Sequence, residues 1–355
     1  FPCARGFRKS VRNSESVGGA MTSHSANHQP FDRRVEKAAL AQEIKESRRA
    51  VLVVNTRSRR GARAYSEAKR RLTEAGIILD ASFPVRHAER LPEIVREEIA
   101  KGRKFIIVGG GDGTISSVID HFAYVSVVFG LLPLGTANSF ARTLGIPLDL
   151  PGAIDVLVGG RVFDVDLGKI NDHYFANGSS IGMPAIVGRA TPHTLKKWLG
   201  RGAYLLVGAS KFMRFAPFRC IIAINGQETS FDALDVRIAN GGYQGGVLVA
   251  PDANPDDGKI VVHILTGASK WALGKQWART ALRAPFRAAD MKILKATELM
   301  IDAVPKQDVA VDGEVITKTP IRVSVGREAL ILMVPQAFVE RFEAGSERTS
   351  PETMT

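Results

Sequence analysis

The chain has 355 residues, of which 45% are hydrophobic and 24% are charged, and its formal net charge is +12. This length allows two ordinary domains, each with a core of its own. The positive charge favours an anionic partner: a polyanion, an anionic membrane surface or an anionic small substrate. Cys3 and Cys220 are the only cysteines, which excludes a disulfide framework and a metal site built from several thiolates.

Two segments need to be compared with targeting and membrane signals. Residues 1–45 are rich in Ser, Asn, Arg and His and lack the uninterrupted apolar run of a signal peptide. We expect a disordered or extended leader there, with Met21 as a candidate start. Residues 121–141 contain no Asp, Glu, Lys or Arg, but Gly130 and Pro133 interrupt them. A buried strand and a turn fit this stretch better than a membrane span, so we expect no transmembrane helix.

Apolar runs alternate with segments of helical period between residues 49 and 135. Strands that alternate with helices of this length predict parallel βαβ units, and therefore an α/β domain over residues 46–160. Gly76 and Gly102 are placed to end the first two helices. The predicted strands are 49–55, 77–83, 104–108 and 126–135, and the predicted helices are 65–75, 91–99 and 115–122.

The pattern changes after about residue 160, where short apolar runs are separated by Gly, Asn or Asp. This pattern predicts an antiparallel, sandwich-like β domain over residues 161–327. Helical segments near 195–213 and 270–283 interrupt it, and residues 346–355 form a tail. The predicted fold class is an N-terminal α/β domain with a parallel sheet, followed by a C-terminal antiparallel β-sandwich.

The stretch FIIVGGGDGTISSVID, residues 105–120, leads from an apolar strand through four glycines into a helix. Glycine permits close approach to the main chain, and a helix N-terminus directs backbone N–H groups at anions. The spacing does not fit a Walker loop, because Thr114 and Ile115 follow Gly113, and it lacks the third glycine of a dinucleotide fingerprint. The stretch is consistent with phosphate binding, and also with a glycine-rich turn that binds nothing.

Two other loops also follow predicted strands with small and polar residues. They are LLPLGTANSFARTLGIP, residues 131–147, and NTRSRRG, residues 55–61. Ligands of parallel sheets bind beyond the carboxyl ends of the strands. Three such loops at one sheet edge indicate a nucleotide site more strongly than three unrelated turns would.

The succession of GGGDGT and PLGTANSFA resembles the diacylglycerol kinase catalytic family, which includes sphingosine kinases and bacterial lipid kinases. The segments VDLGKIND, FANGSSIG, PDANPDDGKI and VDGE resemble the same family in order, and the resemblance spans about residues 49–335. It implies an α/β nucleotide domain, completed by residues 328–345, and a β-sandwich lipid-substrate domain, with ATP in the cleft between them. The implied activity is a lipid kinase that uses ATP and Mg²⁺ and phosphorylates a hydroxyl of a membrane lipid such as diacylglycerol.

The resemblance also implies roles for particular residues. Asp312, in the stretch DVAVDGEVI, would be the general base, with Glu314 beside it near metal or nucleotide. Asp112 would belong to a magnesium and water network, since a carboxylate aimed at phosphates is repelled unless a cation lies between them. Without the resemblance, the Asp-Gly pair at 312 would equally be a hairpin turn. The residues implied to bind nucleotide are Asn55, Thr56, Arg57, Ser58, Arg59, Gly110, Gly111, Asp112, Gly113, Thr114, Thr136 and Glu314.

The stretch PDANPDDGKI, residues 251–260, resembles a structural magnesium site. The Asp257 side chain would be a ligand, with the backbone oxygens of Asn254 and Lys259 nearby. A plain turn rich in Asp, Asn and Pro is the alternative.

The sequence departs from the family pattern at three positions of the implied site. Thr56 stands where the family has Pro, Ser139 where it usually has Asp, and Ser117 where it often has Glu. The implied metal network is therefore short of two carboxylates. Ordered waters could replace them, magnesium could bind less tightly, or the protein could be an impaired kinase.

Basic residues and aromatic residues are interleaved in two stretches. Residues 173–227 contain no Asp or Glu, and Lys275, Arg279, Arg283 and Arg287 recur every four residues. Such patterns are typical of contact with an anionic membrane surface, although a solvated face over core aromatics has a similar composition. We expect a cytoplasmic protein that contacts the membrane peripherally to reach its lipid substrate.

Three alternatives stay open at this stage. An NAD kinase-like phosphotransferase shares a Gly-Gly-Asp-Gly loop, but its usual Asn-Glu pair is absent and PLGTAN counts against it. A nucleic-acid-binding protein would suit the charge, but we find no recognition helix or RNA-binding aromatic motif and expect no nucleic acid. A non-catalytic lipid-binding relative would explain Ser139.

Overall fold

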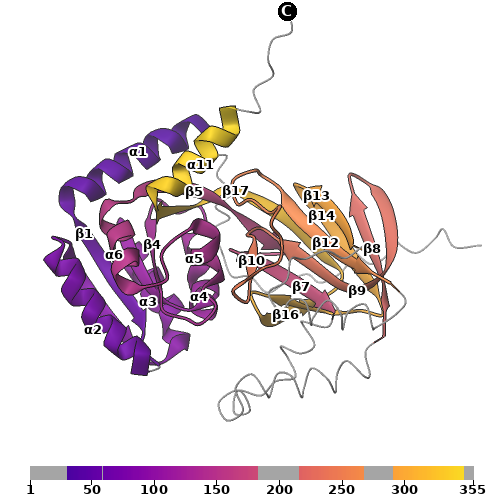
Figure 1. Cartoon of the computed structure of the whole chain (residues 1–355), viewed down its shortest axis with the longest axis horizontal. Coiled ribbons are helices and arrows are strands. Elements are labelled where there is room, and N and C mark those ends of the chain that lie inside the picture. The colour runs from indigo at the N-terminus through magenta and orange to yellow at the C-terminus, as the bar shows by residue number, and fades with distance from the viewer. Residues whose placement is uncertain (1–29, 58, 183–215, 268–290, 348–355) are drawn as a thin grey trace, which may run out of the picture.

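The computed structural model describes residues 30–57, 59–182, 216–267 and 291–347. The chain forms an α/β domain and a β domain, which lie side by side and share two long strands (Figure 1). A mixed sheet runs through both, in the order β16-β15-β7-β9-β8-β14-β17-β4-β3-β1-β2. This arrangement confirms the predicted fold class.

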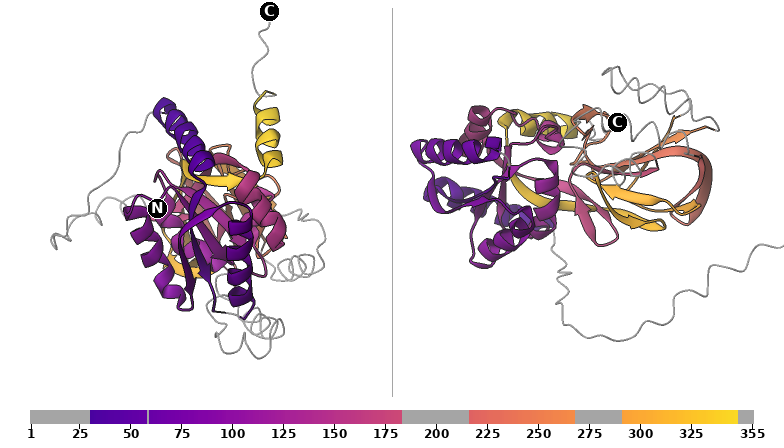
Figure 2. Two further views of the ribbon diagram at one scale, coloured as in Figure 1. Left: turned by 90° about the vertical axis from the view of Figure 1, so that its left-hand side faces the viewer. Right: turned by 90° about the horizontal axis from the view of Figure 1, so that it is seen from below.

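The α/β domain is built on four parallel strands in the order β4-β3-β1-β2. Its central strands are buried along almost their whole length because helices cover both faces of the sheet (Figure 2). Helices α3 and α4 pack together, as do α2 and α6. The strands are β1 Arg49–Asn55, β2 Ile78–Val85, β3 Phe105–Gly110 and β4 Val128–Pro133. The helices are α2 Arg59–Glu74, η1 Ala88–Arg90, α3 Leu91–Ala100, α4 Asp112–Phe122, α5 Ser139–Leu144 and α6 Leu150–Gly159.

Local sequence accounts for these elements. In α3, Leu91, Ile94 and Val95 are buried against the sheet, as their helical spacing predicts. Gly76 and Gly102 follow the ends of α2 and α3 with φ of +85° and +78°. A left-handed residue after a helix is commonly glycine because no Cβ has to be accommodated. The strand and helix order predicted for residues 49–135 is therefore the observed order.

Among the described residues of the β domain, the strand pairings are antiparallel. Its core is a cluster of aliphatic and aromatic side chains that includes Phe175, Phe218, Val236 and Ile301. Its strands are β6 His173–Phe175, β7 Gly178–Gly182, β8 Phe218–Ile224, β9 Gln227–Ala239, β12 Ile260–Thr266, β13 Met291–Ala296, β14 Glu298–Val304, β15 Asp308–Val311 and β16 Glu314–Lys318. A separate hairpin consists of β10 Tyr243–Gln244 and β11 Val247–Leu248.

Strands β5 (Arg161–Ile170) and β17 (Ile321–Val334) form one antiparallel pair that extends through both domains. The pairing shifts between Gly326 and Leu330, and the first part of β17 pairs with β14 while its last part pairs with β4. Within the expected completion 328–345, residues 329–334 and Phe338 of helix α11 (Gln336–Glu347) belong to the core of the α/β domain.

Helix α1, Pro30–Ser47, corrects the expectation of a disordered or extended leader over residues 1–45. Leu40 and Ile44, one helical turn apart, are buried in the core of the α/β domain. Lys37 on the same helix forms an ion pair with Asp164 of β5. The polar composition of the leader as a whole concealed this short apolar face. Residues 1–29 lie outside the described part of the chain.

Some predicted segments cannot be compared with the structure. The helical segments expected near 195–213 and 270–283, with the basic residues they carry, lie outside the described residues, and so do residues 348–355. Among the helices of the described ranges, none combines the length and the apolar character that a membrane span requires.

Candidate nucleotide and phosphoryl-transfer site

Three loops meet at the carboxyl ends of β1, β3 and β4, as the parallel order of these strands requires. Asn55 at the end of β1 donates from Nδ2 to Oγ1 of Thr114 in α4, at 3.0 Å. The N–H of Leu134, after β4, donates to the carbonyl oxygen of Gly110 at 2.9 Å. Hydrogen bonds therefore connect the three loops predicted from the sequence.

The loops after β3 and β4 touch through two glycines. A Cβ added to Gly135 would lie 2.5 Å from the Cα of Gly111, and one added to Gly111 would lie 3.0 Å from the Cα of Gly135. The first of these contacts is too short for a real Cβ, and the second is tighter than most real Cβ contacts, so glycine at both positions allows the two backbones to pack this closely.

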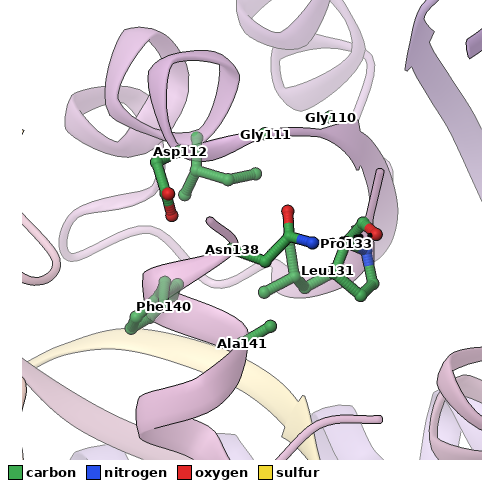
Figure 3. Close-up of a pocket in the computed structure, with 9 residues that line it drawn as sticks. Gly110, Gly111, Asp112, Leu131, Pro133, Asn138, Phe140 and Ala141 are labelled. Atoms are coloured by element: carbon green, nitrogen blue, oxygen red, sulfur yellow. Dashed lines mark hydrogen bonds between the residues drawn. The ribbon is translucent and has the colours of Figure 1, made fainter. Parts of the chain in front are cut away.

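Asn138 fixes the shape of the loop between β4 and α5. It is buried and has the left-handed φ of +48°, which Asn tolerates better than most residues. Its Oδ1 accepts from the N–H of Gly135 at 2.8 Å, and its Nδ2 donates to the carbonyl oxygen of Gly135 at 3.0 Å. Figure 3 shows Asn138 beside Pro133 and Leu131, across the pocket from Gly110 and Gly111.

Asp112 stands at the first position of α4, with its carboxylate directed toward the start of α5 (Figure 3). The N–H of Ser139 donates to Oδ1 at 2.6 Å, and the Ser139 hydroxyl donates to Oδ2 at 3.3 Å. Burial raises the pKa of Asp112, and hydrogen bonds from the N–H groups of Ser139 and Phe140 oppose this rise. No pattern in the sequence marks Ser139 as the residue that holds Asp112.

Asp312 lies in the turn between β15 and β16, in the β domain. Its Oδ1 accepts from the N–H of Gly178 at 3.2 Å, and its own N–H donates to the carbonyl oxygen of Gly178 at 3.0 Å. Burial, with a smaller contribution from the negative charge of Asp112, raises its pKa to about 7 against the opposing hydrogen bond from the Gly178 N–H. The charge of a carboxylate in the α/β domain thus contributes to the pKa of a carboxylate in the β domain.

The other residues implied to bind nucleotide differ in exposure, and Glu314 lies apart from the three loops, at the start of β16. Arg57, Gly113, Thr136 and Glu314 are exposed, whereas Thr56 is buried. The Thr56 hydroxyl has no hydrogen-bond partner within the described ranges. Ser58 and the side chain of Arg59 lie outside the described residues. These roles in nucleotide binding stay predictions.

The turn at residues 251–260 is held by its own hydrogen bonds. Oδ1 of Asp257 accepts from the N–H of Lys259 at 2.9 Å, and the carbonyl oxygen of Asn254 accepts from the N–H of Asp257 at 3.4 Å. The part of the chain that is described contains no group of three or more His, Cys, Asp or Glu side chains that could hold a metal ion. Magnesium at Asn254, Asp257 and Lys259 therefore stays a prediction beside the plain-turn alternative.

Comparison with known proteins matches both halves of the chain. The model of the diacylglycerol kinase catalytic domain matches residues 49–170, and that of the YegS C-terminal NAD kinase beta sandwich-like domain matches residues 178–334. A probable lipid kinase YegS-like protein of Pseudomonas putida is 32% identical over 277 residues, covering 74% of this chain and 90% of the relative. One of Yersinia enterocolitica is 31% identical, covering 68% of this chain and 82% of the relative.

Solved structures from Bacillus anthracis share the fold. One covers 82% of this chain and 98% of its own, with a TM-score of 0.68 and 24% identity. Another, described as a diacylglycerol kinase, has the same coverage, a TM-score of 0.64 and 20% identity. The arrangement of an α/β domain against a β-sandwich is therefore common to these chains.

Proposed function

Because this chain belongs to the family of YegS-like lipid kinases, we propose that it transfers the γ-phosphoryl group of ATP to a hydroxyl of a membrane lipid such as diacylglycerol, with Asp312 as general base. The observation that carries the proposal is that one carboxylate of each domain is held by hydrogen bonds, Asp112 by Ser139 and Asp312 by Gly178, and that the charge of Asp112 contributes to the raised pKa of Asp312. Phosphoryl transfer needs a group that orients the acceptor hydroxyl and a separate group on the nucleotide side. The two carboxylates supply one each.

The nucleotide side is formed by the loops after β1, β3 and β4. Backbone N–H groups at the N-terminus of α4 and in the glycine loops are suited to phosphate oxygens. The close packing of Gly111 on Gly135 leaves no side chain between the two loops. The triphosphate can therefore approach the main chain directly.

Magnesium fits this site as an ion that enters with ATP. Mg²⁺ is commonly held by one or two carboxylates together with substrate phosphates and water. Asp112 would supply the carboxylate, and the described residues contain no group of three or more potential metal ligands, which matches this mode of binding. Bound there, the ion would neutralise charge on the transferring phosphoryl group.

On the acceptor side, Asp312 takes the proton of the lipid hydroxyl. The hydroxyl oxygen forms a bond to the γ-phosphorus, the bond between that phosphorus and the β–γ bridging oxygen breaks, and ADP leaves. A pKa of about 7 suits a general base at neutral pH, because a substantial fraction is ionised and the ionised form is still basic.

The lipid has to come from a bilayer, and we propose that the two basic stretches, within residues 173–227 and 275–287, provide the contact with it. The support is the net charge of +12 and the repeated basic residues at 275, 279, 283 and 287. Clusters of basic residues are attracted electrostatically to anionic lipid, and this attraction needs no membrane-spanning segment.

A phosphorylation assay with labelled ATP, Mg²⁺ and a lipid panel tests the proposal. The panel contains diacylglycerol, monoacylglycerol, phosphatidylglycerol and a sphingoid base in mixed vesicles. Label should pass to at least one lipid with the parent chain and not with Asp312→Asn. Absence of transfer to every lipid, with ATP binding intact, would favour a non-catalytic lipid-binding protein.

A further inference from the structure

Ser139 uses both hydrogen-bonding capacities of its hydroxyl across the boundary between the two domains. Oγ accepts from the N–H of Gly246 at 3.1 Å, and a backbone N–H can only donate. The hydroxyl proton is therefore directed to Oδ2 of Asp112 at 3.3 Å. Ser139 is only 2% exposed, so water does not compete for these bonds. One buried hydroxyl thus connects Asp112 to a residue that follows it by more than 130 positions.

Gly246 is part of the tight hairpin of β10 and β11. Gly245 and Gly246 have φ of +59° and +79°, between the paired residues Gln244 and Val247. Consecutive positive φ values are characteristic of a two-residue type I′ turn, which has little freedom. A Cβ at Gly246 would lie 3.2 Å from the carbonyl oxygen of Ala137. The turn therefore packs against the loop that precedes α5.

The same hairpin also contacts the residue that holds Asp312. A Cβ added to Gly178 would lie 2.1 Å from Nε2 of Gln244, so the Gln244 amide packs directly on Gly178. Gly178 exchanges two hydrogen bonds with Asp312. The hairpin thus contacts the residues that hold both carboxylates: Gln244 contacts Gly178, and Gly246 contacts Ser139.

We propose that Ser139 is a positioning residue that couples the β10–β11 hairpin to Asp112, so that the hairpin fixes Asp112 relative to Asp312. The inference rests on the proposed function in that Asp112 and Asp312 face nucleotide and acceptor. It assigns a role to the residue that departs from the family pattern: the serine hydroxyl provides a contact between domains.

Ser139→Ala removes the shared acceptor and donor, and Ser82→Ala is the matched control. Ser82, on β2, is half-buried and accepts from the hydroxyl of Tyr65 at 3.0 Å, away from the loops. Loss of a hydrogen bond to a charged group predicts a fall in kcat of about 10–100-fold for Ser139→Ala. KM for ATP should stay within about twofold, because the backbone contacts to phosphate remain. Ser139→Thr, which keeps the hydroxyl, should recover part of the lost kcat.

Two further measurements separate coupling from general damage. Hydrogen exchange at the Gly246 amide, followed by NMR, should be faster in Ser139→Ala than in the parent and unchanged in Ser82→Ala. Gly246→Ala displaces the turn, and the double variant with Ser139→Ala should lose no more kcat than the more damaging single change.

Unchanged exchange at Gly246 in Ser139→Ala would overturn the inference, and so would additive losses in the double variant or an equal loss of kcat in Ser82→Ala. If the parent phosphorylates no lipid, the proposed function fails. The Gly246 exchange experiment still decides whether Ser139 couples the hairpin to the α/β domain.

Discussion

Asp312 occupies a backbone conformation that few residues accept. Its φ is +45°, and Gly313 after it has φ of +96°. Asp and Asn tolerate the left-handed region because their short polar side chains can bond locally, whereas most residues are strained there. This conformation allows Oδ1 and the backbone N–H of Asp312 to meet Gly178 at the same time.

Asp312→Asn should preserve this conformation and remove the proton acceptor. We expect kcat to fall by about 10²–10⁴-fold, the usual contribution of a general base. ATP binding, measured by calorimetry, should survive because the nucleotide loops belong to the other domain. Asp308→Asn, at the far end of the same hairpin and paired with Lys318, is the control. A variant Asp312→Asn that works near the parent rate would leave Asp312 as a turn residue only.

The pH dependence of the reaction follows from the pKa of Asp312. The base has to be ionised, and its pKa in the free protein is raised to about 7. The kcat/KM value should therefore rise with pH up to about 7 and level off above it. A profile that is already flat at pH 5 would contradict a base with this pKa.

The same pKa affects stability in the absence of nucleotide. Between the ordinary value of 3.8 and about 7, the unfolded chain has lost the Asp312 proton while the folded chain keeps it. Stability from this group is thus complete below about pH 4 and is lost as pH rises through 7. In urea unfolding, the free energy of unfolding should fall less between about pH 4 and pH 7 for Asp312→Asn than for the parent. Identical pH slopes would count against the raised pKa.

At the scale of elements, the site depends on how closely two loops approach. The loops after β3 and β4 are packed backbone to backbone at Gly111 and Gly135, and Asn138 braces the second loop from inside. Helix α4 begins at the residue that follows Gly111, so any displacement of the loops moves Asp112 as well.

Gly135→Ala should push the two loops apart. Its Cβ would lie 2.5 Å from the Gly111 Cα and 2.8 Å from Oδ1 of Asn138, so we expect a loss of about 1–3 kcal/mol in unfolding free energy and weaker ATP binding. Gly113→Ala is the stability control, because no atom lies within 4 Å of its added Cβ. Urea unfolding and calorimetry measure both effects. Equal unfolding free energies of the two variants would show that the loops can move apart at little energetic cost.

At the scale of the molecule, a short-range backbone pairing and a long-range charge have different roles. The pair β5 and β17 runs through both domains, with one irregularity between Gly326 and Leu330, and its pairing ties the nucleotide loops to the β-sandwich. The large positive charge, by contrast, acts at long range and depends on salt. The strand pairing sets where the two carboxylates lie, and we expect the positive charge to attract the chain to an anionic lipid surface.

We expect the chain to sediment with vesicles of anionic lipid more than with neutral vesicles, and salt should weaken the binding. Each basic residue at the surface contributes about 1 kcal/mol at most. Replacing Lys275, Arg279, Arg283 and Arg287 by Gln should reduce binding more than the same replacement at the exposed residues Arg63, Lys69, Arg86 and Arg90. Equal loss in both variants would mean that only net charge matters, and equal sedimentation with both vesicle types would leave the basic stretches as solvated surface.

The sequence by itself determined the order of strands and helices over residues 49–135, the fold class, the family and the three loops at one sheet edge. Local sequence patterns determine these features, because apolar periodicity selects strand or helix and glycine permits the turns between them. Helix α1 escaped detection because its apolar face, with Leu40 and Ile44, is too short to stand out from a polar leader.

Only the tertiary structure decided which distant groups meet. The charge of Asp112 contributes to the pKa of Asp312, and the Ser139 hydroxyl accepts from the N–H of Gly246, because the long pair β5–β17 and the β10–β11 hairpin hold the two domains against each other. Such contacts depend on the packing of whole domains, and no local pattern of residues encodes them. Packing also set the pKa of Asp312, since burial and the nearby charge of Asp112 exist only in the folded chain.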